Sequence, residues 1–275
     1  MRGAYVVVGS VCAAYLAACL LPSLDSLRGG TGASTPDGSA GVPDGAIVYY
    51  PFEEGTGSTT ADKSGHGFNA VLSNDGVVWT TGKLGNALAF NLDAGPDGGG
   101  GSVDITGSQS PPLSGNASFS VTAWIFATGA PIDDAPIVSN LSGGSDVKGG
   151  FQLDTTIDKG PRTLGFKLLS PTNDAGIGGF RYGTTILTQN EWHFVAGVYD
   201  AAATAMHVYL DGKLDDGVLL GPVLPAFGPP VRRIFIGRRI SASARAIFIG
   251  KIDEVRIFDR ALSGDEITAT FAAGQ

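Results

Sequence analysis

The sequence predicts an all-β domain, a sandwich of two antiparallel sheets with a short C-terminal helix. Short runs of Val, Ile, Phe and Thr are separated throughout by Asp, Asn and glycine, which occurs 42 times in 275 residues. Only 16 % of the residues are charged, and helical periodicity is almost absent. Such punctuated short strands are typical of sandwiches and barrels, and the chain is long enough for one large core.

Residues 1–19 are predicted to be a signal peptide, because Arg2 precedes an apolar run too short to span a membrane. The end of this segment, Leu16-Ala17-Ala18-Cys19, resembles the lipobox of bacterial lipoproteins, in which the cysteine is lipidated and becomes the new N-terminus. Two alternatives stay open: ordinary cleavage after the alanine pair with Cys19 incidental, and an uncleaved anchor. Lipidation at Cys19 would be the domain's one link to a membrane.

A flexible tether is expected over residues 20–45, where Gly, Ser, Pro and Asp dominate and apolar residues become rare after Arg28. The lipobox interpretation places the protein at the bacterial cell envelope. The outer membrane is favoured because Leu20, rather than Asp, follows the cysteine. Secretion is expected if Cys19 is not lipidated.

The folded domain is predicted to comprise residues 46–275, beginning with a strand from Ala46 to Phe52. The loop of residues 61–70 follows this strand. Its oxygen-bearing side chains, of the kind that Ca²⁺ prefers, are Asp62, Ser64 and Asn69. The alternative is an Asx-turn in which Asp62 accepts hydrogen bonds within its own loop, and the spacing alone favours this alternative.

The segment from Ser118 to Ala127 alternates well and is predicted to be a strand near the sandwich centre that is buried on both sides at its end. Trp124 lies on one of its faces. It has two interpretations: a stacking platform for a sugar ring on a concave sheet face, or a core tryptophan, which is the more common role.

The clearest hairpin covers Glu191 to Tyr209, and Asp211-Gly212 then predicts a type I′ turn into another strand. Two histidines, His193 and His207, lie on these strands at no metal-ligand spacing. Since both cysteines precede residue 20, we expect no zinc site in the folded domain.

The segment from Gly250 to Phe258 is predicted to be a strand with period 2. This period places Asp253 on one face with Val255 and Ile257, where a carboxylate needs a cation or several N–H donors. The opposite face contains Glu254 and Arg256 and is expected to be half solvated. Ser263 and Glu266 then form a capping box at the start of a short helix. The side chains expected to hold this helix to the domain are Leu262, Ile267 and Phe271.

Six segments, in order, resemble the LamG-like jelly-roll family over about residues 46–273. They are VYYPFEEGTGSTTADKSGHGFNAVL, GKLGNALAF, SFSVTAWIFA, EWHFVAGVYD, MHVYLDGKL and IFIGKIDEVRIFDRALSGDEI. Each segment alone is a loose match, but the ordered set is specific. The resemblance implies a concanavalin A-like jelly-roll sandwich, in agreement with the strand pattern.

The same resemblance implies one structural Ca²⁺ between the loop after the first strand and the last strand. The implied ligands are the side chains of Asp62 and Asp253 and backbone carbonyls around Ser64, Gly65 and His66. This ion would give Asp253 its partner and tie together the two ends of the domain. A hydrogen-bonded Asp253 without metal stays open as the alternative, because the loop has few side-chain oxygens.

The resemblance further implies a non-catalytic binding module that contacts a glycan or an extracellular protein. The net charge of −8 argues against nucleic acid as a partner. One alternative is a glycoside hydrolase, which needs two carboxylates across a cleft; the candidates are Glu53, Glu54 and Glu254, but the strand signature E-x-D-x-x-E is absent. The other is a purely structural or adhesion protein. Exposed aromatic and Asn side chains on the concave face would favour a sugar ligand. A concave face without such side chains, or a charged one, would favour contact with a protein.

Overall fold

The computed structural model describes residues 43, 45–73, 75–91, 100–105, 111, 113, 116–129, 133–141, 149–169, 178–225, 233–239 and 246–275. The chain divides into two units, residues 1–38 and 39–275, and the description below concerns the second. The predicted signal peptide, Cys19 and almost all of the tether lie outside the described residues. Within the described ranges, no helix has the length and apolar character needed to cross a membrane.

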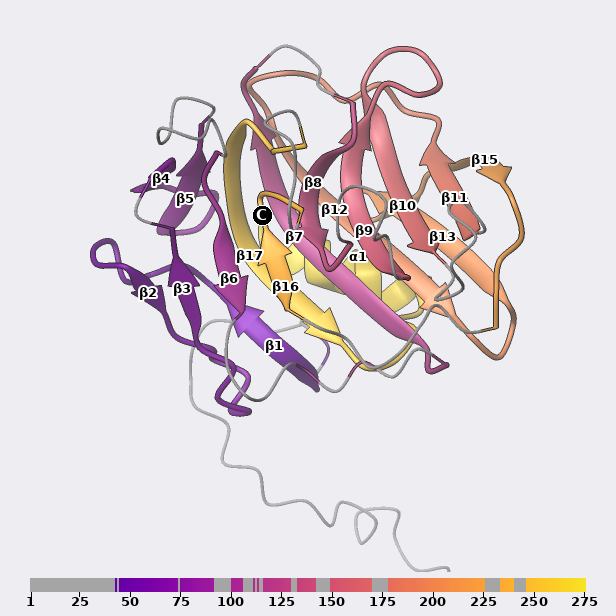
Figure 1. The fold of residues 1–275 in the computed structure, drawn as a ribbon. Helices are drawn as coiled ribbons and strands as arrows, with labels where there is room; N and C mark the ends of the chain where they lie inside the picture. The colour runs from indigo at the N-terminus through magenta and orange to yellow at the C-terminus, as the bar shows by residue number, and fades with distance from the viewer. Residues whose placement is uncertain are drawn as a thin grey trace, which may run out of the picture. The chain divides into compact units, whose positions relative to one another are not determined.

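Two antiparallel sheets and one C-terminal helix confirm the predicted fold (Figure 1). The eight-stranded sheet has the order β14-β13-β12-β7-β17-β5-β4, with β1 also paired to β17. Its strands are β1 (Ala46–Tyr50), β4 (Val77–Thr81), β5 (Asn86–Phe90), β7 (Phe119–Ala127), β12 (Trp192–Asp200), β13 (Ala205–Leu210), β14 (Lys213–Leu214) and β17 (Gly250–Phe258).

The nine-stranded sheet has the order β15-β11-β10-β9-β8-β16-β6-β3-β2. Its strands are β2 (Thr59–Thr60), β3 (Ala70–Leu72), β6 (Val103–Ile105), β8 (Ala135–Ser139), β9 (Gly150–Thr156), β10 (Thr163–Leu169), β11 (Gly178–Gly183), β15 (Asp216–Leu220) and β16 (Ile234–Ile236). Side chains from both sheets form one core between them. At its centre, the Phe119 ring lies 4.8 Å from that of Phe151 and 5.8 Å from that of Phe166.

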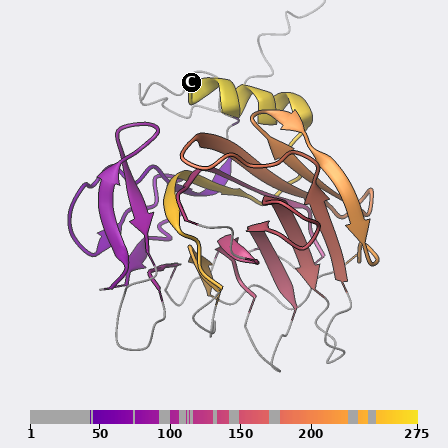
Figure 2. The same cartoon turned by 90° about the horizontal axis from the view of Figure 1, so that it is seen from above.

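Helix α1 (Gly264–Ala273) begins at Ser263 with the predicted capping box, in which Ser263 and Glu266 satisfy each other's backbone N–H groups. The helix covers the outer face of the eight-stranded sheet (Figure 2). Trp124 belongs to the apolar cluster beneath it and is only 2 % exposed. Its ring contacts Phe194 and Phe271, each at 5.6 Å between centroids. A sugar-stacking platform needs an exposed ring, so the core interpretation describes Trp124.

The predicted Asp-Gly turn joins β13 to β14, as expected. Asp211 and Gly212 both have positive φ, 49° and 77°, as a type I′ turn requires. The Asp211 carboxylate also lies 2.9 Å from Nδ1 of His193, which sits beside it on β12. This histidine therefore has a structural partner in Asp211.

The faces expected for β17 were wrong, because the strand contains a β-bulge. Asp253 pairs with Trp124 and Arg256 pairs with Thr122, so three steps on β17 match two on β7. The extra residue is Glu254, whose φ is +53°. Asp253 consequently faces outward beside Trp124, while the residues on both sides of the bulge face the core.

The expectation of a half-solvated face on β17 was also wrong. Glu254 and Arg256 are 4 % and 5 % exposed, and their side chains form an ion pair of 2.6 Å. Tyr49 of β1 closes this pair: its hydroxyl donates to Glu254 at 3.1 Å, and its ring lies 4.0 Å from the Arg256 guanidinium. Period 2 could not show this burial, because β1 is far away in sequence.

A charged cluster on the nine-stranded sheet

Polar side chains occupy the outer face of the nine-stranded sheet at its centre. On β9, Phe151 and Leu153 point into the core, so the alternating Gln152 and Asp154 point outward. Lys167 on β10 pairs directly with Gln152 and shares this face. We define the charged cluster as a buried floor of Gln152, Asp154 and Lys167 and a more exposed rim of Asp133, Asp134, Asp158 and Arg239.

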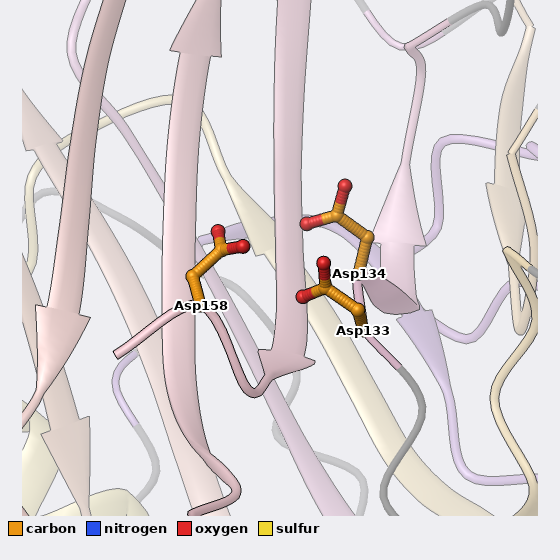
Figure 3. A group of neighbouring side chains, drawn as sticks. All are labelled: Asp133, Asp134 and Asp158. Carbon is orange, nitrogen blue, oxygen red and sulfur yellow. The ribbon is translucent and has the colours of Figure 1, made fainter. Parts of the chain in front are cut away.

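Lys167 is the cation at the centre of the cluster. Its Nζ contacts Asp134 Oδ1 and lies 3.2 Å from Asp154 Oδ2 and 3.6 Å from Asp158 Oδ2. The rim acids Asp133, Asp134 and Asp158 bring carboxylate oxygens within 4.8 Å of one another (Figure 3). Such a group can hold a metal ion, but here an ammonium already compensates part of its charge.

Hydrogen bonds orient each rim side chain. Arg239 donates to Asp134 Oδ2 at 2.8 Å and to Gln152 Oε1 at 2.5 Å. The Tyr182 hydroxyl donates to Asp158 at 2.8 Å, and the Thr156 hydroxyl donates to Asp133 at 2.9 Å. The rim therefore presents carboxylates and a guanidinium in a fixed arrangement.

Burial moves both charged floor residues toward neutrality. It raises the pKa of Asp154 to about 7, although the hydrogen bond from Gln152 opposes the shift. It lowers the pKa of Lys167 to about 7, and the nearby Arg239 lowers it further. Asp154 Oδ1 has no hydrogen-bond partner among the described residues and lies over Gly165, where a Cβ atom would overlap with it. The buried floor is thus closely packed, and one of its carboxylate oxygens has no hydrogen-bond donor among the described residues.

The residues predicted to bind calcium lie in two places. Asp62 accepts from the backbone N–H of Tyr49, Ser64 and Phe68 at 2.9–3.0 Å and from the Ser64 hydroxyl at 2.8 Å. The Ser64 hydroxyl also lies 3.1 Å from Nδ1 of His66. Gly65 completes the turn with φ +88°. These are the bonds of the predicted Asx-turn alternative.

Asp253 instead meets the turn between β4 and β5. Its Oδ2 accepts from the N–H of Lys83 at 2.9 Å and of Leu84 at 3.1 Å, and its Oδ1 accepts from that of Glu254 at 2.8 Å. Asp62 and Asp253 share no partner among these bonds, and N–H donors face the oxygens that an ion would need. The hydrogen bonds match the metal-free alternative, so calcium at these residues stays a prediction.

The glutamates considered for glycoside hydrolysis each have separate partners in the described structure. Glu53 accepts from the N–H of Asn86, and Glu54 accepts from the Thr60 hydroxyl and the N–H of Ala61. Glu254 lies in its ion pair with Arg256. Glu53 and Glu54 therefore bind different parts of the backbone, and Glu254 binds the Arg256 guanidinium.

Sequence reasoning missed the charged cluster. The available signal was the alternation of Gln152 and Asp154 with Phe151 and Leu153 on β9, followed by Lys167 on the next strand. Arg239 follows β16 and contacts Gln152 of β9 because β16 and β9 lie in one sheet.

Together, the two sheets and the outer helix define the concanavalin A-like sandwich. The chain belongs to the concanavalin A-like lectin/glucanases superfamily, whose profile matches residues 97–268. A search of the curated proteins found no match.

Three similar solved structures come from a toxin, an enzyme and a neurotoxin. The binding domain of Paraclostridial Mosquitocidal Protein 1 is 16 % identical, with a TM-score of 0.60, and the match covers 83 % of this chain and 52 % of that one. Domain 4 of AbnA, a GH43 extracellular arabinanase from Geobacillus stearothermophilus solved in complex with arabinotriose, is 18 % identical, with a TM-score of 0.56 and coverages of 82 % and 98 %.

A structure of botulinum neurotoxin type C, whose cell entry depends on interaction with two ganglioside molecules, is 19 % identical, with a TM-score of 0.57 and coverages of 84 % and 52 %. This chain spans about half the length of the two toxin structures. At these identities the similarities show the fold alone.

Proposed function

We propose that this domain is a non-catalytic binding module that holds a glycan on the charged cluster. The observation that carries the proposal is a floor of buried charges on a sheet face that no described helix or strand covers (Figure 2). Buried ion pairs contribute little stability compared with apolar residues of similar volume. A pre-arranged cluster of this kind therefore suits a ligand better than it suits the core.

The chemistry of the rim fits hydroxyl groups. The carboxylates of Asp134 and Asp158 can accept hydrogen bonds from sugar hydroxyls, and the Arg239 guanidinium can donate hydrogen bonds to sugar hydroxyl oxygens. Because other side chains already orient these groups, binding costs little side-chain entropy. The structures of an arabinotriose-bound domain and of a ganglioside-dependent toxin support a carbohydrate ligand for this fold.

An extracellular protein is the second candidate partner, and one observation favours it. Among the described residues no Phe, Trp or Tyr side chain is exposed, and those nearest the surface, such as Trp79, Trp192 and Tyr209, are half-buried, so the described surface offers little ring area for sugar stacking. A charged face without rings is also what a protein partner of opposite charge would contact.

A glycan array probed with the purified full-length chain tests the proposal, followed by affinity measurements on the glycan that binds. We expect Asp134→Asn and Arg239→Gln each to weaken binding about tenfold or more, the effect of losing one charge-assisted hydrogen bond. Asp265→Asn, an exposed acid on α1 behind the other sheet, is the matched control. Unchanged affinity in both rim variants would place the glycan elsewhere, and an array without any bound glycan would favour the protein partner.

The non-catalytic part of the proposal rests on accessibility. Asp154 has the raised pKa of a possible general acid, but it is 0 % exposed and cannot touch a substrate in this structure. Glu53, Glu54 and Glu254 are each engaged by different hydrogen-bond or ion-pair partners. Incubation with the bound oligosaccharide should release no reducing ends; hydrolysis that disappears in Asp154→Asn would establish an enzyme.

Surface display is proposed from the sequence alone. The proposal comprises a signal peptide over residues 1–19, lipidation of Cys19, a tether over residues 20–45 and one binding domain over residues 46–275. Several acyl chains at one cysteine would hold the domain firmly at the cell envelope. Cys19→Ser should move the protein from the membrane fraction to the soluble fraction of the producing bacterium, and an unchanged distribution would contradict lipidation.

A further inference from the structure

A second polar site lies on other strands of the nine-stranded sheet. It is a pocket of about 290 Å³, near the lower end of the range for pockets that hold small molecules. Its lining comes from β3, β6, the residues beside them and the start of β16. The lining residues are Val71, Leu72, Ser73, Ser102, Asp104 and Arg233.

An oriented ion pair forms one wall of this pocket. Arg233 donates through Nε to Asp104 Oδ1 at 3.2 Å, and its Nη2 contacts Asp104 Oδ2. Its guanidinium also lies 5.1 Å from the ring centre of Phe235, the residue that pairs directly with Asp104 across the sheet. The Arg233 side chain nevertheless stays 59 % exposed, so the guanidinium is fixed by two partners and still reachable from solvent.

The rest of the lining includes an apolar side chain and one fixed hydroxyl. Val71 of β3 pairs directly with Asp104 across the sheet and is 45 % exposed. The Ser73 hydroxyl accepts from the N–H of Ser102 at 3.0 Å and donates to the Asp75 carbonyl at 2.8 Å. These bonds hold the edge of the pocket in one conformation.

We infer that this pocket binds one neutral sugar ring. Asp104 accepts hydrogen bonds from two ring hydroxyls, Arg233 donates to a ring oxygen or hydroxyl, and Val71 contacts the C–H face of the ring. The opposite charges of Asp104 and Arg233 cancel, so the pocket has no net charge to attract an ionised ligand. The inference rests on the proposed glycan function and gives it a second contact point on the same sheet as the charged cluster.

Saturation-transfer NMR of the full-length chain with neutral methyl glycosides tests this inference. The probes are the methyl glycosides of glucose, galactose, mannose and arabinose, with the methyl glycoside of sialic acid as the charged comparison. We expect a neutral glycoside to bind, and Asp104→Asn and Val71→Asp each to weaken it about tenfold or more. Val78→Asp is the matched control, because Val78 is a similarly exposed valine (51 %, against 45 % for Val71) on the other sheet.

The outcomes separate this inference from the proposed function. If Asp134→Asn abolishes glycan binding while Asp104→Asn and Val71→Asp leave it intact, the charged cluster is the site and the pocket inference is overturned. Failure of every neutral glycoside to bind the wild type also overturns it, even if longer glycans bind on the array. A preference for the sialic acid glycoside would contradict the neutral ligand. Circular dichroism of each variant checks that the fold is retained.

Discussion

The Lys167 ammonium lies 3.2 Å from Asp154 Oδ2 beneath the outer surface of the nine-stranded sheet. Burial disfavours the charged form of both side chains, so it raises the pKa of Asp154 to about 7 and lowers the pKa of Lys167 to about 7. Asp134 and Asp158 place further carboxylates beside the Lys167 ammonium, and Arg239 forms an ion pair with Asp134. The cluster consequently depends on having both signs of charge present.

Lys167→Met should destabilise the domain strongly. It retains the length and packing of the side chain but leaves Asp154 and Asp134 without their central cation. Removing one partner of a buried ion pair costs about 3–5 kcal/mol in the free energy of unfolding. Denaturant unfolding measures this cost, and adding Asp154→Leu to the same chain should recover part of it.

The control for this prediction is an exposed ion pair. Arg260 lies 2.7 Å from Glu266, and its side chain is 40 % exposed. Arg260→Met should lower the free energy of unfolding by less than about 1 kcal/mol. Similar losses in the two variants would show that Lys167 is not compensating a buried charge.

The N-terminus of α1 depends on Ser263. Ser263→Ala removes the hydroxyl that accepts from the Glu266 N–H at 3.3 Å and should cost about 0.5–2 kcal/mol. Ser263→Thr retains the hydroxyl and should remain close to the wild type in chemical unfolding. If Thr and Ala are equally destabilising, the loss comes from packing rather than from the capping box.

Asp253 should make stability depend on pH. Burial raises its pKa to about 7, although the N–H groups of Leu84, Glu254 and Lys83 oppose the shift. An unfolded Asp has a pKa of about 4, so the folded state binds more protons between about pH 4 and 7. The free energy of unfolding should therefore fall as pH rises through this range, by at most roughly 4 kcal/mol from this group.

Asp253→Asn isolates this effect, because the amide does not titrate. The difference in unfolding free energy between wild type and Asp253→Asn should change steadily from pH 4 to pH 7 in denaturant titrations. A difference that stays constant with pH would mean that Asp253 keeps an ordinary pKa, with the N–H donors outweighing burial.

Local patterns were enough to predict the fold. The capping box at Ser263 and Glu266, the Asp-Gly turn at 211–212 and the alternation of β7 each depend on residues near one another in sequence. The bulge at Glu254 was not predictable by the same means. It depends on how β17 pairs with β7, more than a hundred residues earlier, and one extra residue reverses every face assignment before it.

The charged cluster shows the same limit for the site. Asp133, Asp154, Lys167 and Arg239 come from four separate segments that only the strand order β10-β9-β8-β16 brings together. A single carboxylate on a strand has no partner that can be identified from its own sequence neighbours. Asp253 illustrates this, since two of its three N–H donors, those of Lys83 and Leu84, belong to a turn about 170 residues away.

Chelator should leave the thermal midpoint of the full-length chain unchanged. The reason is that both predicted calcium carboxylates already accept backbone N–H groups, three for Asp62 and three for Asp253. A metal that binds only the folded state would raise the midpoint by mass action.

Thermal unfolding with excess Ca²⁺ and with chelator, for wild type and Asp253→Ala, decides between the alternatives. A chelator effect present in the wild type and absent in Asp253→Ala would establish the calcium site and require the loop around Asp62 to rearrange on binding. Without such an effect, the lower midpoint expected for Asp253→Ala reflects only the N–H groups left without an acceptor.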